Sequence, residues 1–233
     1  MSSDGSTYDG IIAVLEAELA VLADGFEGLT EEQWRTPTLL TPGESGKPPW
    51  TVLELAGHVH ISIGITDLLI AEAVSGAPEP QRDAADFFIF PSRDVSSEFY
   101  EYAFTMVEGT SPAALPGVLR DTFARTIRQA RSNQPSLVGA FPGFEPYPLI
   151  RLDEFVSTRI VEAVVHGIDL TDALARPSSA TPAGIAHTVR LLDELLTRSR
   201  DGERPPDLHD DAAWLRAASG RAPHPDPRLP LLD

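Results

Sequence analysis

The chain has 233 residues, of which 42% are apolar and 23% charged, and this composition excludes a chain that is disordered throughout. Its 35 acidic and 18 basic side chains give a formal charge of −17, so nucleic acid and anionic lipid surfaces are repelled and are not expected partners. The chain contains no cysteine, which excludes disulfides and thiolate ligands and leaves His, Asp and Glu to hold any metal ion.

The apolar stretches of the sequence predict a cytoplasmic protein that is not inserted in a membrane. The first of them, residues 11–23, is interrupted by Glu16 and Glu18 and has no basic flank, unlike a signal peptide. The apolar stretch at residues 59–70 is too short to cross a bilayer.

Helical periodicity recurs along the chain and predicts an all-α fold. Apolar residues return every three or four positions in several long stretches, and we find no convincing alternation with the period of two that marks a strand. Four long helices with short connections predict a bundle. The predicted helices cover residues 8–26, 51–74, 111–131, 153–175 and 181–198, with a short helix at 211–218.

Local signals place the helix ends and the loops. Thr51 and Glu54 form a capping box directly after two prolines, and Ser111 followed by proline starts another helix. Residues 37–49 and 135–148 are rich in proline and are predicted to be loops. The aromatic-rich segment 86–108 is predicted to mix loop with a short helix.

The composition changes near residue 200 and suggests two units. Residues 1–200 are expected to form the helical bundle. Residues 201–233 hold the short helix and a proline-rich end, which we expect to pack on the surface of the bundle without regular structure.

Two histidines occupy different faces of the helix at residues 51–74. At about 100° per residue, His58 shares a face with the apolar residues Leu55, Ile65 and Leu69, whereas His60 lies roughly 200° away on a more polar face. His58 is therefore the candidate ligand.

Glu162 and His166 are four residues apart in the helix at residues 153–175, and this spacing places them on one face. That helix is apolar on nearly every side, which is typical of a buried central helix. A buried carboxylate and imidazole are costly unless something compensates them, and a metal ion would do so. The alternatives are a surface pair or a hydrogen bond without metal.

Several residues near His58, Glu162 and His166 in the sequence can have either a functional or a structural role. Asp169 could orient a ligand histidine or make a structural hydrogen bond. Arg159 could approach an anionic substrate or form an ion pair with Glu162 or Asp153. Trp50 and the aromatic residues of segment 86–108 are more typical of packing than of substrate contact. We assign no role to the remaining histidines, which are His187, His209 and His224.

Two motifs resemble a known family. Trp50-Thr51-Val52 followed by His58, and then Arg159 to Leu170 (RIVEAVVHGIDL), are similar to the signature of the N-terminal domain of mycothiol-dependent maleylpyruvate isomerases, within the DinB-like superfamily. The similarity runs from about residue 11 to residue 175. The resemblance implies a DinB-like four-helix bundle with additional short C-terminal helices.

The same resemblance implies a divalent metal, usually zinc, held by His58, Glu162 and His166, which would then be the catalytic residues. It also implies a low-molecular-weight thiol, mycothiol in actinobacteria, whose thiolate attacks a small electrophile in an isomerase or S-transferase reaction. The C-terminal part shows no sterol-carrier-like α/β domain, so we assign the family and not the specific isomerase activity.

Two other functions stay open at this point, a hydrolase that uses metal-bound water and a non-catalytic helical binding protein. The expected partners are therefore the electrophile and the thiol, with no nucleic acid and no membrane. The protein itself is expected to be a monomer or a homodimer.

Overall fold

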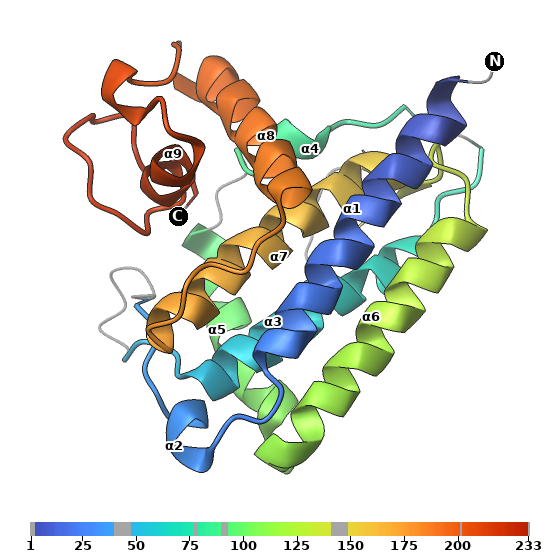
Figure 1. The fold of residues 1–233 in the computed structure, drawn as a ribbon. Coiled ribbons are helices and arrows are strands. Elements are labelled where there is room, and N and C mark those ends of the chain that lie inside the picture. The colour runs from blue at the N-terminus through green and yellow to red at the C-terminus, as the bar shows by residue number, and fades with distance from the viewer. Residues whose placement is uncertain are drawn as a thin grey trace.

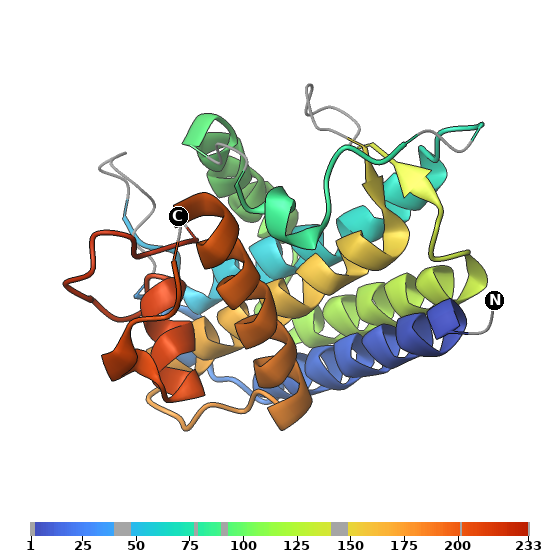
Figure 2. The same cartoon turned by 90° about the horizontal axis from the view of Figure 1, so that it is seen from above.

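The computed structural model describes residues 3–39, 48–76, 79–89, 93–140, 149–200 and 202–232. Four helices within these residues pack around a common core (Figures 1 and 2). Each of them contacts two of the others, in the cyclic order α1, α7, α3, α6, so the predicted all-α bundle is confirmed. Their bounds are α1 Ser3–Gly25, α3 Val52–Ala71, α6 Leu115–Ser132 and α7 Leu152–Ala173.

Further helices pack on the outside of this bundle (Figure 1). Helix α5, Arg93–Val107, lies on α3, whereas α8, Pro182–Arg200, lies on α7 and carries α9, Asp211–Ala218, on its other side. The predicted helix at 211–218 is thus confirmed with its bounds. The short helical turns are α2 Glu31–Trp34, α4 Ala84–Phe87, η2 Pro112–Ala114 and η3 Pro206–Leu208.

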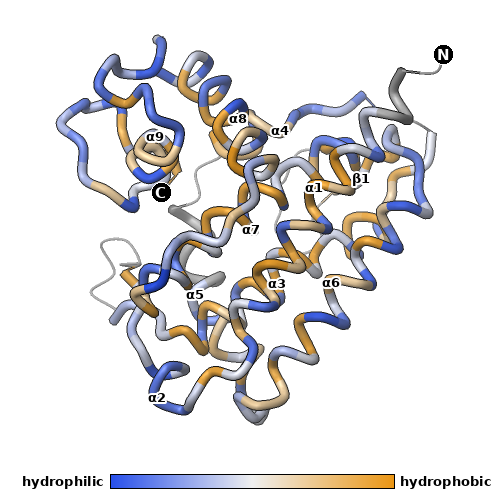
Figure 3. The backbone as a smooth tube through the Cα atoms, in the orientation of Figure 1, coloured by the Kyte–Doolittle hydropathy of each residue, from blue (hydrophilic) through white to orange (hydrophobic). Residues whose placement is uncertain are grey.

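Helix α7 is the most deeply buried element, as its apolar sequence predicts. Phe155, Ile160 and Val164 are fully buried, and apolar residues make up much of α7 and of its neighbour α3 (Figure 3). Helix α3 starts at the predicted capping box, where the Glu54 carboxylate accepts a hydrogen bond of 2.8 Å from the Thr51 backbone N–H. Helices α3 and α7 pack directly against each other in the bundle.

Two parts of the observed fold differ from the predictions. The segment 86–108 contains α5, a helix of 15 residues, which is longer than the short helix expected. A two-stranded antiparallel hairpin, β1 Val138–Gly139 and β2 Ile150–Arg151, was not predicted, because two residues are too few for a visible alternation. Residues 40–47 and 141–148 of the predicted loops lie outside the described residues.

A buried carboxylate on α1 anchors the start of α8. The Glu18 side chain is 2% exposed and accepts a hydrogen bond of 2.8 Å from the Thr181 backbone N–H. The first backbone N–H groups of a helix have no partners within it, so the carboxylate satisfies a group that would otherwise lack an acceptor. The Thr181 hydrogen bond lowers the pKa of Glu18, but burial outweighs it and raises that pKa above its usual value. Gly184 permits the contact, since a Cβ at that position would lie 2.2 Å from Glu18 Oε1. This contact joins the start of α8 to α1.

The C-terminal segment, residues 202–232, shares the core of the bundle. Trp214 is fully buried, and Leu215 and Leu231 belong to the same hydrophobic cluster as the residues of α1, α3 and α7. The segment is therefore joined to the rest of the described chain by buried apolar contacts, in addition to polar ones described below.

Among the described residues, α3 alone is long and apolar enough to cross a membrane by length and composition. Its most apolar window has a mean hydropathy of 1.3, and 56% of that window is buried inside the structure. Burial of this extent is typical of a core helix, which passes the same test.

Candidate metal centre

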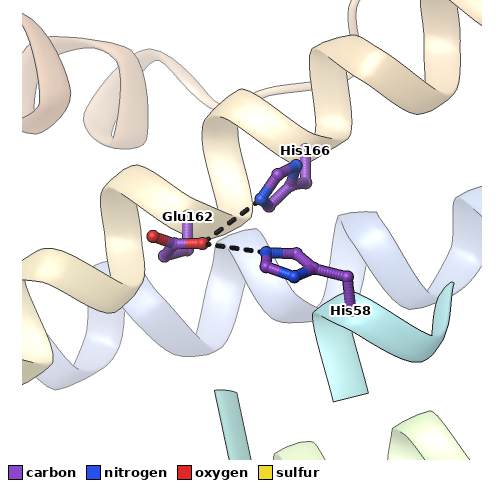
Figure 4. A group of neighbouring side chains, drawn as sticks. All are labelled: His58, Glu162 and His166. Carbon is purple, nitrogen blue, oxygen red and sulfur yellow. Dashed lines mark ion pairs between the residues drawn. The ribbon is translucent and has the colours of Figure 1, made fainter. Parts of the chain in front are cut away.

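Three side chains from two helices meet at one point between α3 and α7 (Figure 4). His58 Nε2 lies 3.6 Å from Glu162 Oε2, and His166 Nε2 lies 3.2 Å from the same oxygen. One ligand atom from each residue lies within 4.8 Å of the other two. The three side chains are 14%, 19% and 10% exposed, in the order His58, Glu162, His166, so the group lies close to the surface without being solvated.

The helices bring these side chains together by spacing and close packing. Glu162 and His166 share one face of α7 because they are one turn apart. His58 faces them from α3 and follows Gly57, where a Cβ would lie 2.3 Å from the carbonyl oxygen of Ala103 on α5. The absence of a side chain at Gly57 thus allows α5 to hold α3 in this position.

The Glu162 carboxyl is held in its ionised form. Burial alone would raise its pKa, but hydrogen bonds with His166 and His58 and the charge of Arg159 hold the pKa of Glu162 well below its usual range. The ionised Glu162 carboxylate thus places a negative charge beside two imidazole nitrogens, each of which can act as a metal ligand.

The two imidazoles differ in their proton affinity. Burial lowers the pKa of His58, and the neighbouring Glu162 offsets this only in part. Burial would also lower the pKa of His166, but hydrogen bonds with Asp169 and Glu162 raise it above its usual value. The His166 ring therefore lies between two carboxylates, with Nε2 beside Glu162 and Nδ1 beside Asp169.

Asp169 contacts the far side of the His166 ring. Its Oδ2 lies 2.9 Å from His166 Nδ1, and it is 2% exposed. Burial would raise the pKa of Asp169, but the charge of Arg221 and the hydrogen bond with His166 lower it, so the carboxylate accepts and Nδ1–H donates. The lone pair of His166 Nε2 is thereby directed toward His58 and Glu162, which is the arrangement found around metal-ligating histidines.

Arg159 contributes charge beside the group. Its guanidinium is almost completely buried, donates to the Ser62 carbonyl at 2.6 Å, and lies 4.0 Å from Glu162 Oε1. Asp153, the other predicted partner, pairs with Arg151 at 2.5 Å instead. Of the two interpretations of Arg159, the structure supports the ion pair with Glu162.

Aromatic rings pack against the His58 ring. The Trp50 ring lies 4.8 Å from the His58 ring, and Tyr100 stacks on Trp50 at 5.8 Å. The Tyr100 hydroxyl donates to the Pro48 carbonyl at 2.9 Å and so connects these rings to the segment that precedes α3. Trp50 thus packs as expected, although it packs directly on a proposed ligand.

The other histidines lie elsewhere. His60 Nδ1 contacts the Thr122 hydroxyl of α6 at 3.3 Å, as its polar helical face predicts. In the described part of the chain, the three residues above are the one group of His, Asp or Glu with a geometry suited to a metal ion. The remaining contacts are His187 with Arg190, His209 with the Pro206 carbonyl and His224 with Asp207.

Arg221 is a residue of this site that the sequence did not single out. It lies after α9, outside both motifs, and reaches Asp169 across the fold. A lone arginine in a proline-rich tail carries no spacing signal, so only the tertiary structure identifies it.

Comparison with known families agrees with this geometry. The family model for the mycothiol maleylpyruvate isomerase N-terminal domain matches residues 15–171, more than half of the chain. The chain belongs to this family. The match begins within α1, ends in the last turn of α7 and includes His58, Glu162 and His166, and the family lies within the DinB-like superfamily. Comparison with curated proteins and with solved structures finds no match.

The donor set of this family member fits a divalent ion. Two imidazole nitrogens and one carboxylate oxygen are ligands that zinc and similar ions accept, and three protein ligands leave a coordination position open. Asp169 supplies the hydrogen bond that orients one of the imidazoles.

Proposed function

We propose that the chain is a metal-dependent enzyme in which a low-molecular-weight thiol, mycothiol for this family, attacks a small electrophile. The observation that carries the proposal is the convergence of His58, Glu162 and His166 within 4.8 Å in a chain that matches the mycothiol maleylpyruvate isomerase domain. These three residues are the proposed metal ligands and catalytic residues.

Each residue has a physical task in this proposal. Glu162 contributes the negative charge, and His58 and His166 contribute neutral nitrogen donors on either side of it. When bound, the ion supplies a Lewis acid that lowers the pKa of a thiol to below neutrality. Asp169 keeps the His166 proton on Nδ1, and the rings of Trp50 and His58 pack together and exclude water from one side of the site.

The reaction class follows from thiol chemistry. A thiolate sulfur adds to an electrophilic double bond, and the negative charge moves to the neighbouring atoms of the substrate. If the former double bond rotates and the C–S bond breaks again, the outcome is isomerisation with the thiol regenerated. If the carbanion takes a proton instead, the C–S bond is retained and the outcome is S-transfer.

Several finer assignments are parts of the same proposal. We propose zinc as the ion, a cytoplasmic location, a bundle domain at residues 1–200 with the segment 201–233 packed on it, and a monomer or homodimer. The family of the chain and its lack of a thiol ligand of its own support an external thiol. The large negative charge argues against nucleic acid and anionic membranes as partners.

The first test is metal content, with two histidines of α3 as a matched pair. Wild-type protein and H60A, purified without chelator and incubated with zinc, are expected to hold about one ion per chain after desalting, because a three-ligand site is preformed. H58A and H166A are expected to retain little zinc while their circular dichroism stays helical. Zinc content that is equal in H58A and H60A would contradict the proposal.

The second test concerns the thiol. Zinc-loaded protein is expected to unfold at a higher temperature with mycothiol, because a ligand of the folded state stabilises it. S-methyl mycothiol, whose sulfur cannot ionise, is the control and is expected to give a much smaller shift. Equal shifts with both compounds would argue against sulfur binding to the ion and would favour the hydrolytic function, which needs no thiol.

A further inference from the structure

The C-terminal segment reaches the candidate metal centre through one side chain. Arg221 follows α9, and its Nε and Nη2 donate to Asp169 Oδ1 and Oδ2 at 2.9 and 2.7 Å. A third bond, from Nη1 to the Ser219 carbonyl at 2.5 Å, fixes the guanidinium to its own segment. The fork therefore fixes the orientation of the Asp169 carboxylate relative to the guanidinium.

This fork sets the orientation of a proposed ligand. Asp169 Oδ2, which accepts from Arg221, also accepts from His166 Nδ1 at 2.9 Å. If the fork is removed, the carboxylate can rotate about its side-chain bonds, and His166 loses the partner that holds its ring and its tautomer. Groups that orient a ligand histidine in this way usually change metal affinity 10-fold to 100-fold when they are lost.

A second ion pair makes the same connection without touching the site. Arg216 on α9 donates to both oxygens of Asp172 at 2.5 and 2.7 Å, one turn beyond Asp169 on α7. Both pairs join the C-terminal segment to α7 with a bidentate guanidinium. They differ in that Asp172 lies beyond the three proposed ligands and Asp169 bonds to one of them.

We propose that Arg221 is a positioning residue of the metal centre, so that the C-terminal segment at residues 202–232 completes a site whose ligands all lie in α3 and α7. The inference rests on the metal site of the proposed function. It adds a residue from outside the range 15–171 that the family model matches.

The proposal implies that metal binding and docking of the segment are coupled. If docking of the segment through Arg221 raises the affinity for zinc by some factor, bound zinc raises the equilibrium constant for docking by the same factor, because coupling between two sites is reciprocal. Backbone amides of α9 are therefore expected to exchange more slowly with solvent deuterium when zinc is bound. The same amides of R221Q are expected to exchange at rates that zinc does not alter.

The experiment compares zinc affinity in the full-length chain, measured by competition with a chromophoric chelator. R221Q is expected to bind zinc about 10-fold to 100-fold more weakly than wild type, and R216Q within about 3-fold of it. R221K keeps the charge and loses the fork, so an intermediate affinity is expected. Cobalt substitution gives a second readout, since the visible spectrum of bound cobalt is expected to change in R221Q and not in R216Q.

The outcomes separate the inference from the proposed function. Wild-type protein that binds neither zinc nor cobalt would overturn both. Wild-type binding with equal affinities in R221Q and R216Q would overturn the inference alone, because the segment would then act through general docking or not at all. If R221Q does not fold, the zinc affinities and cobalt spectra of R221K and R216K are compared instead. Weaker zinc binding in R221K than in R216K would support the inference, and equal binding would overturn it.

Discussion

The imidazole rings of His58 and His166 meet edge to face, with their centroids 4.6 Å apart and their planes at 76°. Both rings point a nitrogen at the same oxygen of Glu162. Two imidazoles at this distance repel each other when both are protonated, so the arrangement favours one proton or one cation at its centre. Because a metal ion satisfies all three side chains at once, it should stabilise the folded state.

Zinc is therefore expected to raise the unfolding temperature of the chain. At a free concentration of about 100 times Kd, the gain in unfolding free energy is about 2.7 kcal/mol, which corresponds to roughly 5 to 10 °C for a chain of this size. Differential scanning fluorimetry with zinc and with EDTA measures the shift. H60A is expected to respond as wild type does, and a similar shift in H166A would show that zinc binds elsewhere.

Much of the site follows from local sequence pattern. The stripe of apolar residues around His58 predicted which histidine of α3 faces the core, and the spacing of Glu162 and His166 predicted their common face on α7. Both inferences need only the geometry of a single helix. The contacts of His60 with Thr122 confirm that the second histidine of α3 points away.

The contacts between helices could not be predicted in the same way. No pattern in the sequence states that α3 and α7 are neighbours in the bundle, and the resemblance to a family supplied that expectation. The fork from Arg221 to Asp169 depends on how a proline-rich segment folds back over α7. The hairpin of β1 and β2 is similarly fixed by tertiary contacts, since two residues per strand carry no periodicity.

Two glycines beside the proposed ligands are expected to respond in opposite ways to alanine. G57A places a Cβ 2.3 Å from the Ala103 carbonyl oxygen, so α3 and α5 must separate at a cost of about 1 to 3 kcal/mol. G167A meets nothing within 4 Å and should stabilise α7 by about 0.5 to 1 kcal/mol. Urea unfolding measures both changes.

Zinc affinity gives a second comparison of the same two variants. G57A moves the residue directly before His58 and is expected to weaken zinc binding, whereas G167A leaves the α7 backbone in place and is expected to bind zinc as wild type does. Equal stability of G57A and wild type would show that the contact with α5 adjusts without strain.

The buried Glu18 carboxylate is expected to contribute strongly to stability through Thr181. E18A leaves the partly buried Thr181 N–H without its acceptor and opens a cavity where the buried Glu18 side chain lay, for a loss of about 2 to 4 kcal/mol in urea unfolding. E18Q keeps an acceptor oxygen and should lose about 1 kcal/mol or less. The control is E16A on the exposed side of α1, where the pair with Arg131 is solvated and its loss should cost about 0.5 kcal/mol. Similar losses in E18A and E16A would contradict the anchoring role.

His187 is expected to make the fold sensitive to mild acid. Burial and the charge of Arg190 lower the pKa of His187 from its usual 6.5 to about 4. Between these two values the unfolded chain binds a proton that the folded chain does not, so stability is lost as the pH falls from about 6.5 toward about 4. By pH 5 this loss amounts to about 1 to 2 kcal/mol.

H187Q isolates this contribution from the other groups that titrate in acid. Gln binds no proton, so the unfolding free energy of H187Q should fall by about 1 to 2 kcal/mol less than that of wild type between pH 7.5 and pH 5. Urea unfolding at the two pH values gives this double difference, in which the carboxylates of both proteins cancel. H209Q, the same change of residue type at a surface histidine beside the Pro206 carbonyl, is the control for the substitution itself. A parallel loss in wild type and H187Q would mean that His187 takes up its proton in the folded state as readily as in the unfolded chain.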